Sequence, residues 1–169
     1  MADEGDPIEA GRMTIPGAVE RAAERYGDGE ALVDGDLRLS FRDLAAPVDE
    51  AARALVAWGL GPGDRVAIWA PNMAEWVIAA LGAYRAGAVV VTVNTRFKGG
   101  EAAHVLRTSG ARLLFTVTDF LDTDYVGLLD AVAPEERPTT LEQIVVLRGP
   151  VPDGTLGWEA LLARAGEGD

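Results

Sequence analysis

Short apolar runs alternate along this chain with longer segments in which apolar residues recur every three or four positions. The runs predict strands over residues 66–70, 88–93, 113–117 and 144–147. The longer segments predict helices that begin near Thr14, Ser40 and Pro71, followed by helices over 98–108, 120–132 and 158–165. Helices and strands that alternate with short loops are typical of an α/β fold. We therefore predict a mostly parallel sheet flanked by helices.

The segment before the first central strand predicts a β-hairpin and a capped helix. Residues 31–33 and 37–39 form the two strands, and Asp34-Gly35-Asp36 forms the turn between them. Ser40 then caps a helix, with Asp43 at the capping-box position that Glu usually occupies. Pro47 falls inside this helical pattern, which allows a kink.

The chain divides into three parts by composition. Residues 1–13 are polar, and we expect them to be disordered. Residues 14–148 carry the alternating pattern and form one α/β region without a linker. Residues 149–169 are rich in glycine and proline at first, and we expect a loop and a short helix at a truncated end.

Charge and composition exclude several classes of function. The 169 residues carry a formal net charge of −12 without a basic stripe, so a nucleic-acid partner is not expected. The chain has no cysteine, which excludes disulfides, thiol catalysis and thiolate-bound zinc. Its first residues are acidic and lack the apolar stretch of a signal peptide. No apolar run approaches the ~20 residues that span a bilayer. We predict a cytoplasmic protein without a membrane span.

Two glycine-containing loops are candidates for binding phosphate. Gly61 and Gly63 follow a helix and open a strand, the reverse of a phosphate loop, so we interpret them as a plain turn. The second loop, Arg96-Phe97-Lys98-Gly99-Gly100, follows a strand and opens a helix. Two cations and helix N–H groups then meet at the carboxyl edge of the sheet, where ligands of open α/β folds bind. The alternative is a solvated loop with ordinary charges at a helix end.

Other polar and aromatic residues have structural explanations. His104 lies within a helix and lacks a nucleophile motif, so a packed or surface position is expected. Asp119, Asp122 and Asp124 lack EF-hand spacing and form an acidic solvated face. Core packing is expected for four aromatic residues, Trp58, Trp69, Trp76 and Tyr84. The sequence lacks GxxxxGK(S/T), GxGxxG, GxSxG and HExxH, so we assign no catalytic residue and no metal ligand.

Four segments in order resemble the start of the adenylate-forming superfamily of AMP-binding acyl-CoA synthetases. They are TIPGAVERAAERYGDGEALVDGD, LSFRDL, GLGPGDRVAIWAPNMAEWVIAALGAYRAGAVVVTVNTRF and GGEAAHVLRTSGARLLFT. Within that superfamily, VAIWAPN, VNTRF and LLFTVTDFL look most like bacterial synthetases of fatty-acid and steroid degradation. Thr92 departs from the family pattern, which usually has Pro there.

The resemblance implies an N-terminal subdomain of the adenylate-forming fold and a two-step reaction. A carboxylic acid attacks the α-phosphate of Mg-ATP, and coenzyme A then displaces AMP from the acyl-adenylate. The resemblance implies that the full-length enzyme uses ATP, Mg²⁺ and coenzyme A. It is also compatible with a homo-oligomer of the full-length enzyme. The family's T-S-G-type phosphate loop and its late catalytic Lys are absent from this chain, so we expect the chain alone to be inactive and to bind none of these ligands tightly.

The resemblance also assigns one ligand contact. Asn94-Thr95-Arg96 matches the family's N-P-R segment, whose Arg lies beside the 3′-phosphate of coenzyme A in some ligases. Arg96 is therefore the first candidate for binding coenzyme A, and Lys98 is the second. Two alternatives stay open: a stand-alone nucleotide- or coenzyme-A-binding module, and a non-catalytic interaction protein. A reading frame that continues past Asp169 to a T-S-G-T-T-G-like stretch favours the ligase.

Overall fold

A five-stranded parallel sheet forms the centre of the molecule in a computed structural model that describes residues 14–166. The strands lie in the order β4-β3-β5-β6-β7, and every neighbouring pair is parallel. This sheet confirms the predicted fold class. The segment expected to be disordered, 1–13, lies outside the described residues.

The elements follow one another with short connections. In chain order they are α1 (Ile15–Tyr26), β1 (Glu30–Asp34), β2 (Leu37–Ser40), α2 (Phe41–Trp58), β3 (Arg65–Trp69), α3 (Ala74–Arg85), β4 (Val89–Thr92), α4 (Gly99–Ser109), β5 (Leu113–Val117), α5 (Tyr125–Asp130), the 3₁₀ turn η1 (Pro134–Glu136), β6 (Gln143–Arg148), β7 (Leu156–Gly157), α6 (Trp158–Leu162) and the 3₁₀ turn η2 (Ala163–Gly166).

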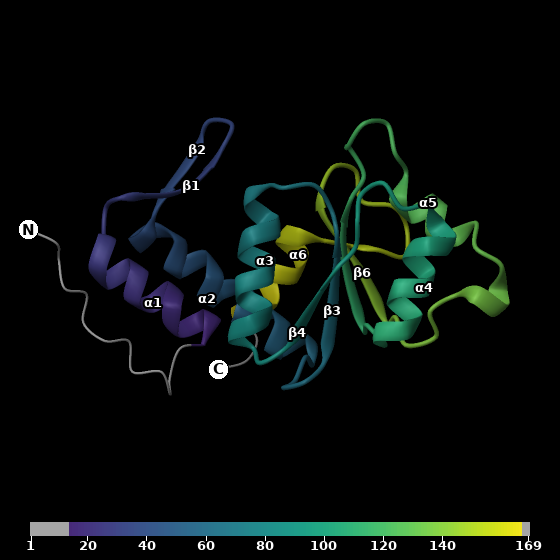
Figure 1. The fold of residues 1–169 in the computed structure, drawn as a ribbon, viewed down its shortest axis with the longest axis horizontal. Coiled ribbons are helices and arrows are strands. Elements are labelled where there is room, and N and C mark those ends of the chain that lie inside the picture. Colours follow the sequence, from purple (N-terminus) through teal and green to yellow (C-terminus); the bar gives the residue numbers. More distant parts are fainter. Residues whose placement is uncertain (1–13, 167–169) are drawn as a thin grey trace, which may run out of the picture.

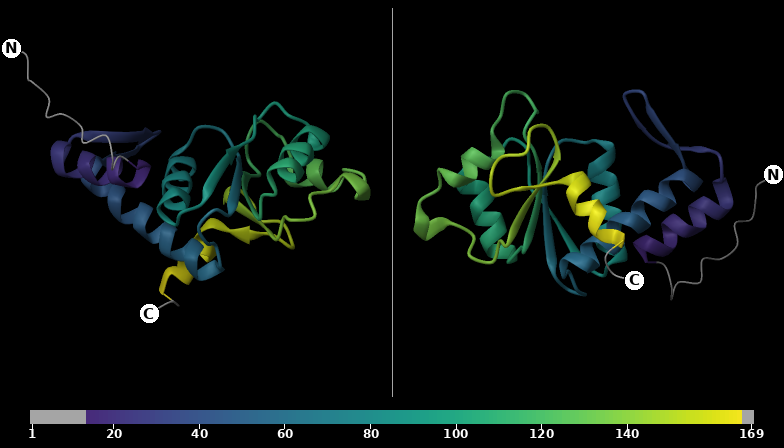
Figure 2. Two further views of the ribbon diagram at one scale, coloured as in Figure 1. Left: turned by 60° about the horizontal axis from the view of Figure 1, so that its bottom comes forward. Right: turned by 180° about the vertical axis from the view of Figure 1, so that it is seen from behind.

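Helices cover both faces of the sheet (Figures 1 and 2). Helices α2, α3 and α6 lie on one face, and α4 and α5 lie on the other. The central strands β3 and β5 are almost wholly buried because both of their faces are covered. Strand β4 lies at the edge of the sheet, so its Val89 is 49% exposed despite its apolar sequence.

The predicted hairpin is confirmed and forms a two-stranded sheet of its own, at the end of the molecule that carries α1 (Figure 1). Asp34 pairs with Leu37, so a two-residue turn joins β1 to β2. The predicted capping box is also confirmed: the Ser40 hydroxyl accepts the Asp43 N–H at 3.1 Å, and the Asp43 carboxylate accepts the Ser40 N–H at 3.3 Å. Helix α2 therefore starts directly from the hairpin.

Helix α3 approaches α2 closely, because Gly82 has no side chain. A Cβ at Gly82 would lie 2.7 Å from the Cβ of Ala51 and 3.1 Å from the backbone nitrogen of Ala52. Small residues on both helices thus set the distance between them.

Two expectations for the second half of the chain were wrong. The predicted helix over 120–132 is limited to α5, because Leu121 and Asp122 adopt left-handed backbone conformations with φ of 52° and 51°. The strand β7, within the segment expected to hold only a loop and a helix, was missed because it has just two residues. It pairs with β6, and Trp158 after it is buried in the core.

Candidate functional site

The loop that carries Arg96 and Lys98 lies at the carboxyl edge of the sheet, as predicted. It connects the end of β4 to the start of α4, and the parallel strands β3 and β5 end at the same edge. Both side chains are exposed, and neither forms an ion pair with any residue between 14 and 166. These two cations are therefore available to an anionic ligand.

A tight turn fixes the backbone on either side of Arg96. The side-chain oxygen Oδ1 of Asn94 accepts the Arg96 N–H at 2.9 Å. The carbonyl of Asn94 accepts the Phe97 N–H at 3.0 Å. An Asn side chain that closes a turn on its own backbone is the usual reason for Asn at such a position.

Two buried aromatic side chains hold the carbonyl groups of this turn. Trp69 Nε1, at the end of β3, donates to the Asn94 carbonyl at 3.0 Å. The Tyr125 hydroxyl, at the start of α5, donates to the Thr95 carbonyl at 3.2 Å, and burial raises the pKa of that hydroxyl. The two rings pack edge to face with centroids 4.6 Å apart. Core packing was predicted for Trp69 and is confirmed, but its hydrogen bond to the turn was not foreseen.

The start of α4 differs from a phosphate-binding helix start in two respects. The Glu101 carboxylate accepts the Lys98 N–H at 2.8 Å, which occupies one N–H and adds a negative charge. Gly99 is buried, and a Cβ there would overlap the carbonyl of Leu128 in α5. Gly99 therefore allows two helices to pack, whereas Gly100 has open space around its Cα. An anion at this edge would depend on Arg96 and Lys98 rather than on the glycines.

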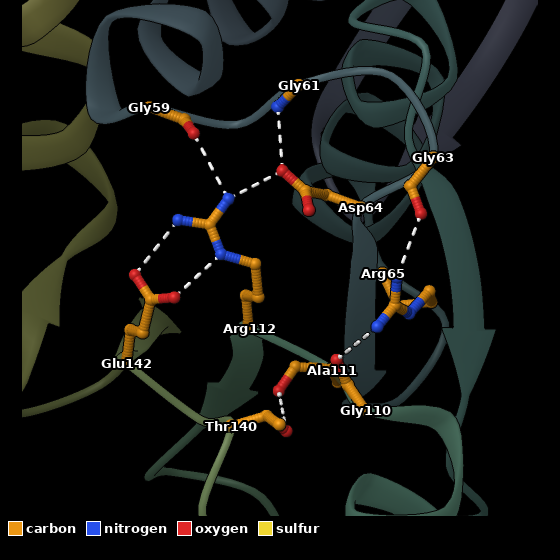
Figure 3. Close-up of polar contacts among 10 residues, drawn as sticks. All are labelled: Gly59, Gly61, Gly63, Asp64, Arg65, Gly110, Ala111, Arg112, Thr140 and Glu142. Carbon is orange, nitrogen blue, oxygen red and sulfur yellow. Dashed lines mark hydrogen bonds and ion pairs between the residues drawn. The ribbon is translucent and has the colours of Figure 1, made fainter.

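The other glycine loop, before β3, lies at the opposite, amino edge of the sheet and is the plain turn that was predicted (Figure 3). The Asp64 carboxylate accepts the Gly61 N–H at 2.9 Å, and the same oxygen contacts Arg112 Nη1 at 2.5 Å. The Gly61 hydrogen bond, followed by Arg112, lowers the pKa of Asp64. The polar groups of this loop thus bond to neighbouring residues of the chain.

Arg112 connects the starts of three neighbouring strands (Figure 3). It contacts Asp64 before β3, and its Nε and Nη2 donate to Glu142 before β6 at 2.7 and 3.0 Å. Its guanidinium also lies 5.4 Å from the ring centre of Trp58. The hydrogen bonds to Glu142 and Asp64 raise the pKa of Arg112, and the bond from Arg112 lowers the pKa of Glu142. This cluster stabilises the fold at the edge away from the candidate site.

A second ion cluster was not foreseen from the sequence. Arg148, at the end of β6, lies 2.8 Å from Asp34 of the hairpin and 2.7 Å from Glu75 of α3. Asp34 also accepts the Ala74 N–H at 3.1 Å, so it caps the start of α3. The bond from Arg148 is the first cause of a lowered pKa at Asp34. Local patterns do not reveal this cluster because its members are 73 and 114 positions apart.

The remaining candidates take structural positions, although the helix cap made by Asp124 was not expected. His104 is exposed on α4. Asp124 caps α5 by accepting the Gly127 N–H at 2.8 Å. Trp58, Trp76 and Tyr84 are partly buried against the core. Within residues 14–166, no three His, Cys, Asp or Glu side chains gather as metal ligands would, and no helix is long and apolar enough to cross a bilayer.

Curated relatives match most of this chain. A 3-[(3aS,4S,7aS)-7a-methyl-1,5-dioxo-octahydro-1H-inden-4-yl]propanoyl:CoA ligase of Rhodococcus jostii is 41% identical over 142 residues, which is 83% of this chain and 26% of that protein. The ligase of the same name from Mycobacterium tuberculosis is 39% identical over 150 residues, covering 89% and 28%. The mouse mitochondrial medium-chain acyl-CoA ligase ACSF2 is 32% identical over 167 residues, covering 91% and 27%. The chain thus spans about a quarter of the length of these relatives.

Solved structures share the fold. The anthranilate CoA ligase AuaEII, crystallised with anthranoyl-AMP, superposes with a TM-score of 0.79 at 25% identity, covering 89% of this chain and 28% of that one. The N-terminal domain of FACL13 from Mycobacterium tuberculosis gives 0.74 at 25% identity, covering 91% and 36%. The family model described as "AMP-binding enzyme" matches residues 19–166. This chain, which is similar to acyl-CoA ligases, therefore belongs to the AMP-binding enzyme family.

Proposed function

We propose that this chain is part of an acid–thiol ligase that makes an acyl-CoA through an acyl-adenylate. A carboxylate oxygen attacks the α-phosphorus of ATP and releases pyrophosphate. The thiolate of coenzyme A then attacks the acyl carbon and releases AMP. The observation that carries the proposal is the 41% identity, over 83% of this chain, to a ligase that forms a CoA thioester.

The contribution of these residues to that reaction is binding rather than chemistry. Arg96 is exposed, free of ion pairs within the described part of the chain, and held on a fixed turn at the carboxyl edge. A guanidinium binds phosphate with two parallel hydrogen bonds, so Arg96 suits the 3′-phosphate of coenzyme A. Lys98, two positions later, adds a second positive charge but no planar fork.

We assign the activation of ATP to residues outside this sequence. The chain contains no T-S-G-type loop, and no three potential metal ligands gather among the described residues. We assign ATP and Mg²⁺ to the full-length protein. The chain alone is accordingly expected to form no acyl-adenylate.

For the acid, we propose a propanoate side chain carried on a fused ring system. The support is the pair of ligases from Rhodococcus jostii and Mycobacterium tuberculosis, which are 41% and 39% identical to this chain, against 32% for the mouse medium-chain ligase.

The test is acyl-CoA formation by the full-length protein. It is incubated with Mg-ATP, coenzyme A and a panel of acids, including straight-chain acids and a methyl-dioxo-octahydroindenyl propanoate, and thioesters are measured by mass spectrometry. The proposal expects a thioester, with the ring-bearing propanoate preferred over the straight-chain acids. Absence of any thioester, or pyrophosphate release by the 169-residue chain alone, would overturn it.

A further inference from the structure

Four hydrogen bonds constrain the short stretch around Arg96 from three directions. Trp69 and Tyr125 donate to the carbonyls of Asn94 and Thr95, which are consecutive in the chain. The Asn94 side chain accepts the Arg96 N–H, and the Asn94 carbonyl accepts the Phe97 N–H. The backbone at Arg96 is thus held by β3, by α5 and by the turn itself, while the Arg96 side chain is exposed.

The two aromatic donors are buried far more deeply than the turn that they hold. Trp69 is 0% exposed and Tyr125 is 2% exposed. Thr116 of β5, also 0% exposed, fixes Trp69 in turn, because its hydroxyl donates to the Trp69 carbonyl at 3.0 Å. Buried Trp and Tyr need an acceptor for their polar ends. Here both acceptors are on one loop, so the core itself sets the position of that loop.

We infer that Tyr125, together with Trp69, positions Arg96 for its contact with coenzyme A. The inference rests on the proposed function, because it deepens the role of the Arg96 loop in binding coenzyme A. A ligand contact made by a long flexible side chain gains affinity when its backbone is already fixed, since less freedom is lost on binding. Tyr125 itself is buried, so its side chain is out of reach of coenzyme A and acts through Arg96.

Tyr125→Phe tests this role with the least disturbance, because it removes one hydroxyl and keeps the ring that packs on Trp69. In the full-length ligase the variant should raise the KM for coenzyme A about 2- to 10-fold, the effect of one hydrogen bond. The rate of acyl-adenylate formation, followed by pyrophosphate release without coenzyme A, should stay unchanged. If Tyr125 had a purely structural role, Tyr125→Phe would lower the rates of both half-reactions together.

A double-mutant cycle shows whether Tyr125 acts through Arg96. Tyr125→Phe in an Arg96→Ala background should raise the KM for coenzyme A no further than Arg96→Ala alone. Thr140→Val is the matched control, because it removes a comparable side-chain bond, to the Ala111 carbonyl at 3.1 Å, at the far edge of the sheet (Figure 3). It should leave the KM for coenzyme A unchanged.

The outcomes separate this inference from the proposed function. If Arg96→Ala raises the KM and Tyr125→Phe does not, the positioning role is overturned while the proposed contact stands. If Arg96→Ala has no effect on the KM, the contact itself fails and the positioning role fails with it. Additive effects in the double variant, or an equal rise with Thr140→Val, would also overturn the inference, because the hydroxyl would then act by another route.

Discussion

Arg112 and Glu142 form a two-pronged ion pair across the starts of β5 and β6, with N–O distances of 2.7 and 3.0 Å. The same guanidinium contacts Asp64 before β3. Arg112, Asp64 and Glu142 at the amino edge of the sheet are therefore paired with one another. At the carboxyl edge, by contrast, Arg96 forms no ion pair within residues 14–166. The Arg112 cluster thus stabilises the fold, whereas Arg96 remains a cation without an ion pair within the described residues.

Arg112→Met should lower the free energy of unfolding by about 1–3 kcal/mol, because it leaves the partly buried Asp64 without its charged partner. Arg38→Met is the control. Its pair with Glu30 is exposed, and such surface pairs contribute at most about 1 kcal/mol. Urea unfolding of both variants measures the difference. Equal losses for the two would contradict the role assigned to Arg112.

Gly99→Ala and Gly100→Ala should have opposite effects on stability. A methyl group at Gly99 overlaps the Leu128 carbonyl, so α4 and α5 must separate, at a cost of about 1–3 kcal/mol. Gly100 has open space, and Ala there stabilises the helix by up to about 1 kcal/mol. Thermal unfolding of the two variants compares them directly. A tolerated Gly99→Ala would show that the two helices are not packed as described.

Asp34→Asn should destabilise the protein at neutral pH by about 1–2 kcal/mol, because Arg148 loses an anionic partner. The pKa of Asp34 is lowered in the folded state, so its contribution is complete above the unfolded pKa, about 4, and is lost as the pH falls through the lower folded value. The stability difference between wild type and Asp34→Asn should therefore close as the pH drops below about 4.

Urea midpoints from pH 7 to pH 3 measure that closure. Asp28→Asn is the control, because Asp28 pairs with Arg42 on a fully solvated surface and its removal should matter little at any pH. A difference between wild type and Asp34→Asn that stays constant over this range would show that the carboxylate charge of Asp34 does not stabilise the fold.

The sheet could be predicted because strands such as β3 and β5 are continuous apolar runs. Such runs indicate strands that are buried on both faces of a parallel sheet. The helix predicted over 120–132 was too long because apolar residues precede Asp124. Asp124 is itself a helix-cap residue and marks the true start of α5. Two-residue β7 carries too little pattern to be recognised, and only its pairing with β6 defines it.

The position of the candidate site was predicted, but the hydrogen bonds that hold its turn were not. Arg96 and Lys98 follow a strand and open a helix, which places them at the carboxyl edge from the sequence alone. The supports of the turn were not predictable, because Trp69 and Tyr125 fit apolar patterns and lie 25 and 30 positions from the carbonyls that they bind. The hydrogen bond of Glu101 to the Lys98 N–H at the helix start was not predicted either.

The proposed contact between Arg96 and coenzyme A is tested most directly by Arg96→Ala in the full-length protein, assayed with coenzyme A and with dephospho-coenzyme A, which lacks the 3′-phosphate. The loss of one partly exposed charge-assisted bond, about 1–2 kcal/mol, should lower the affinity for coenzyme A roughly 5- to 30-fold. The rate of adenylate formation should stay nearly unchanged. With dephospho-coenzyme A, variant and wild type should behave alike. An equal loss with both thiols would contradict the assignment, because Arg96 would then only hold the loop in place.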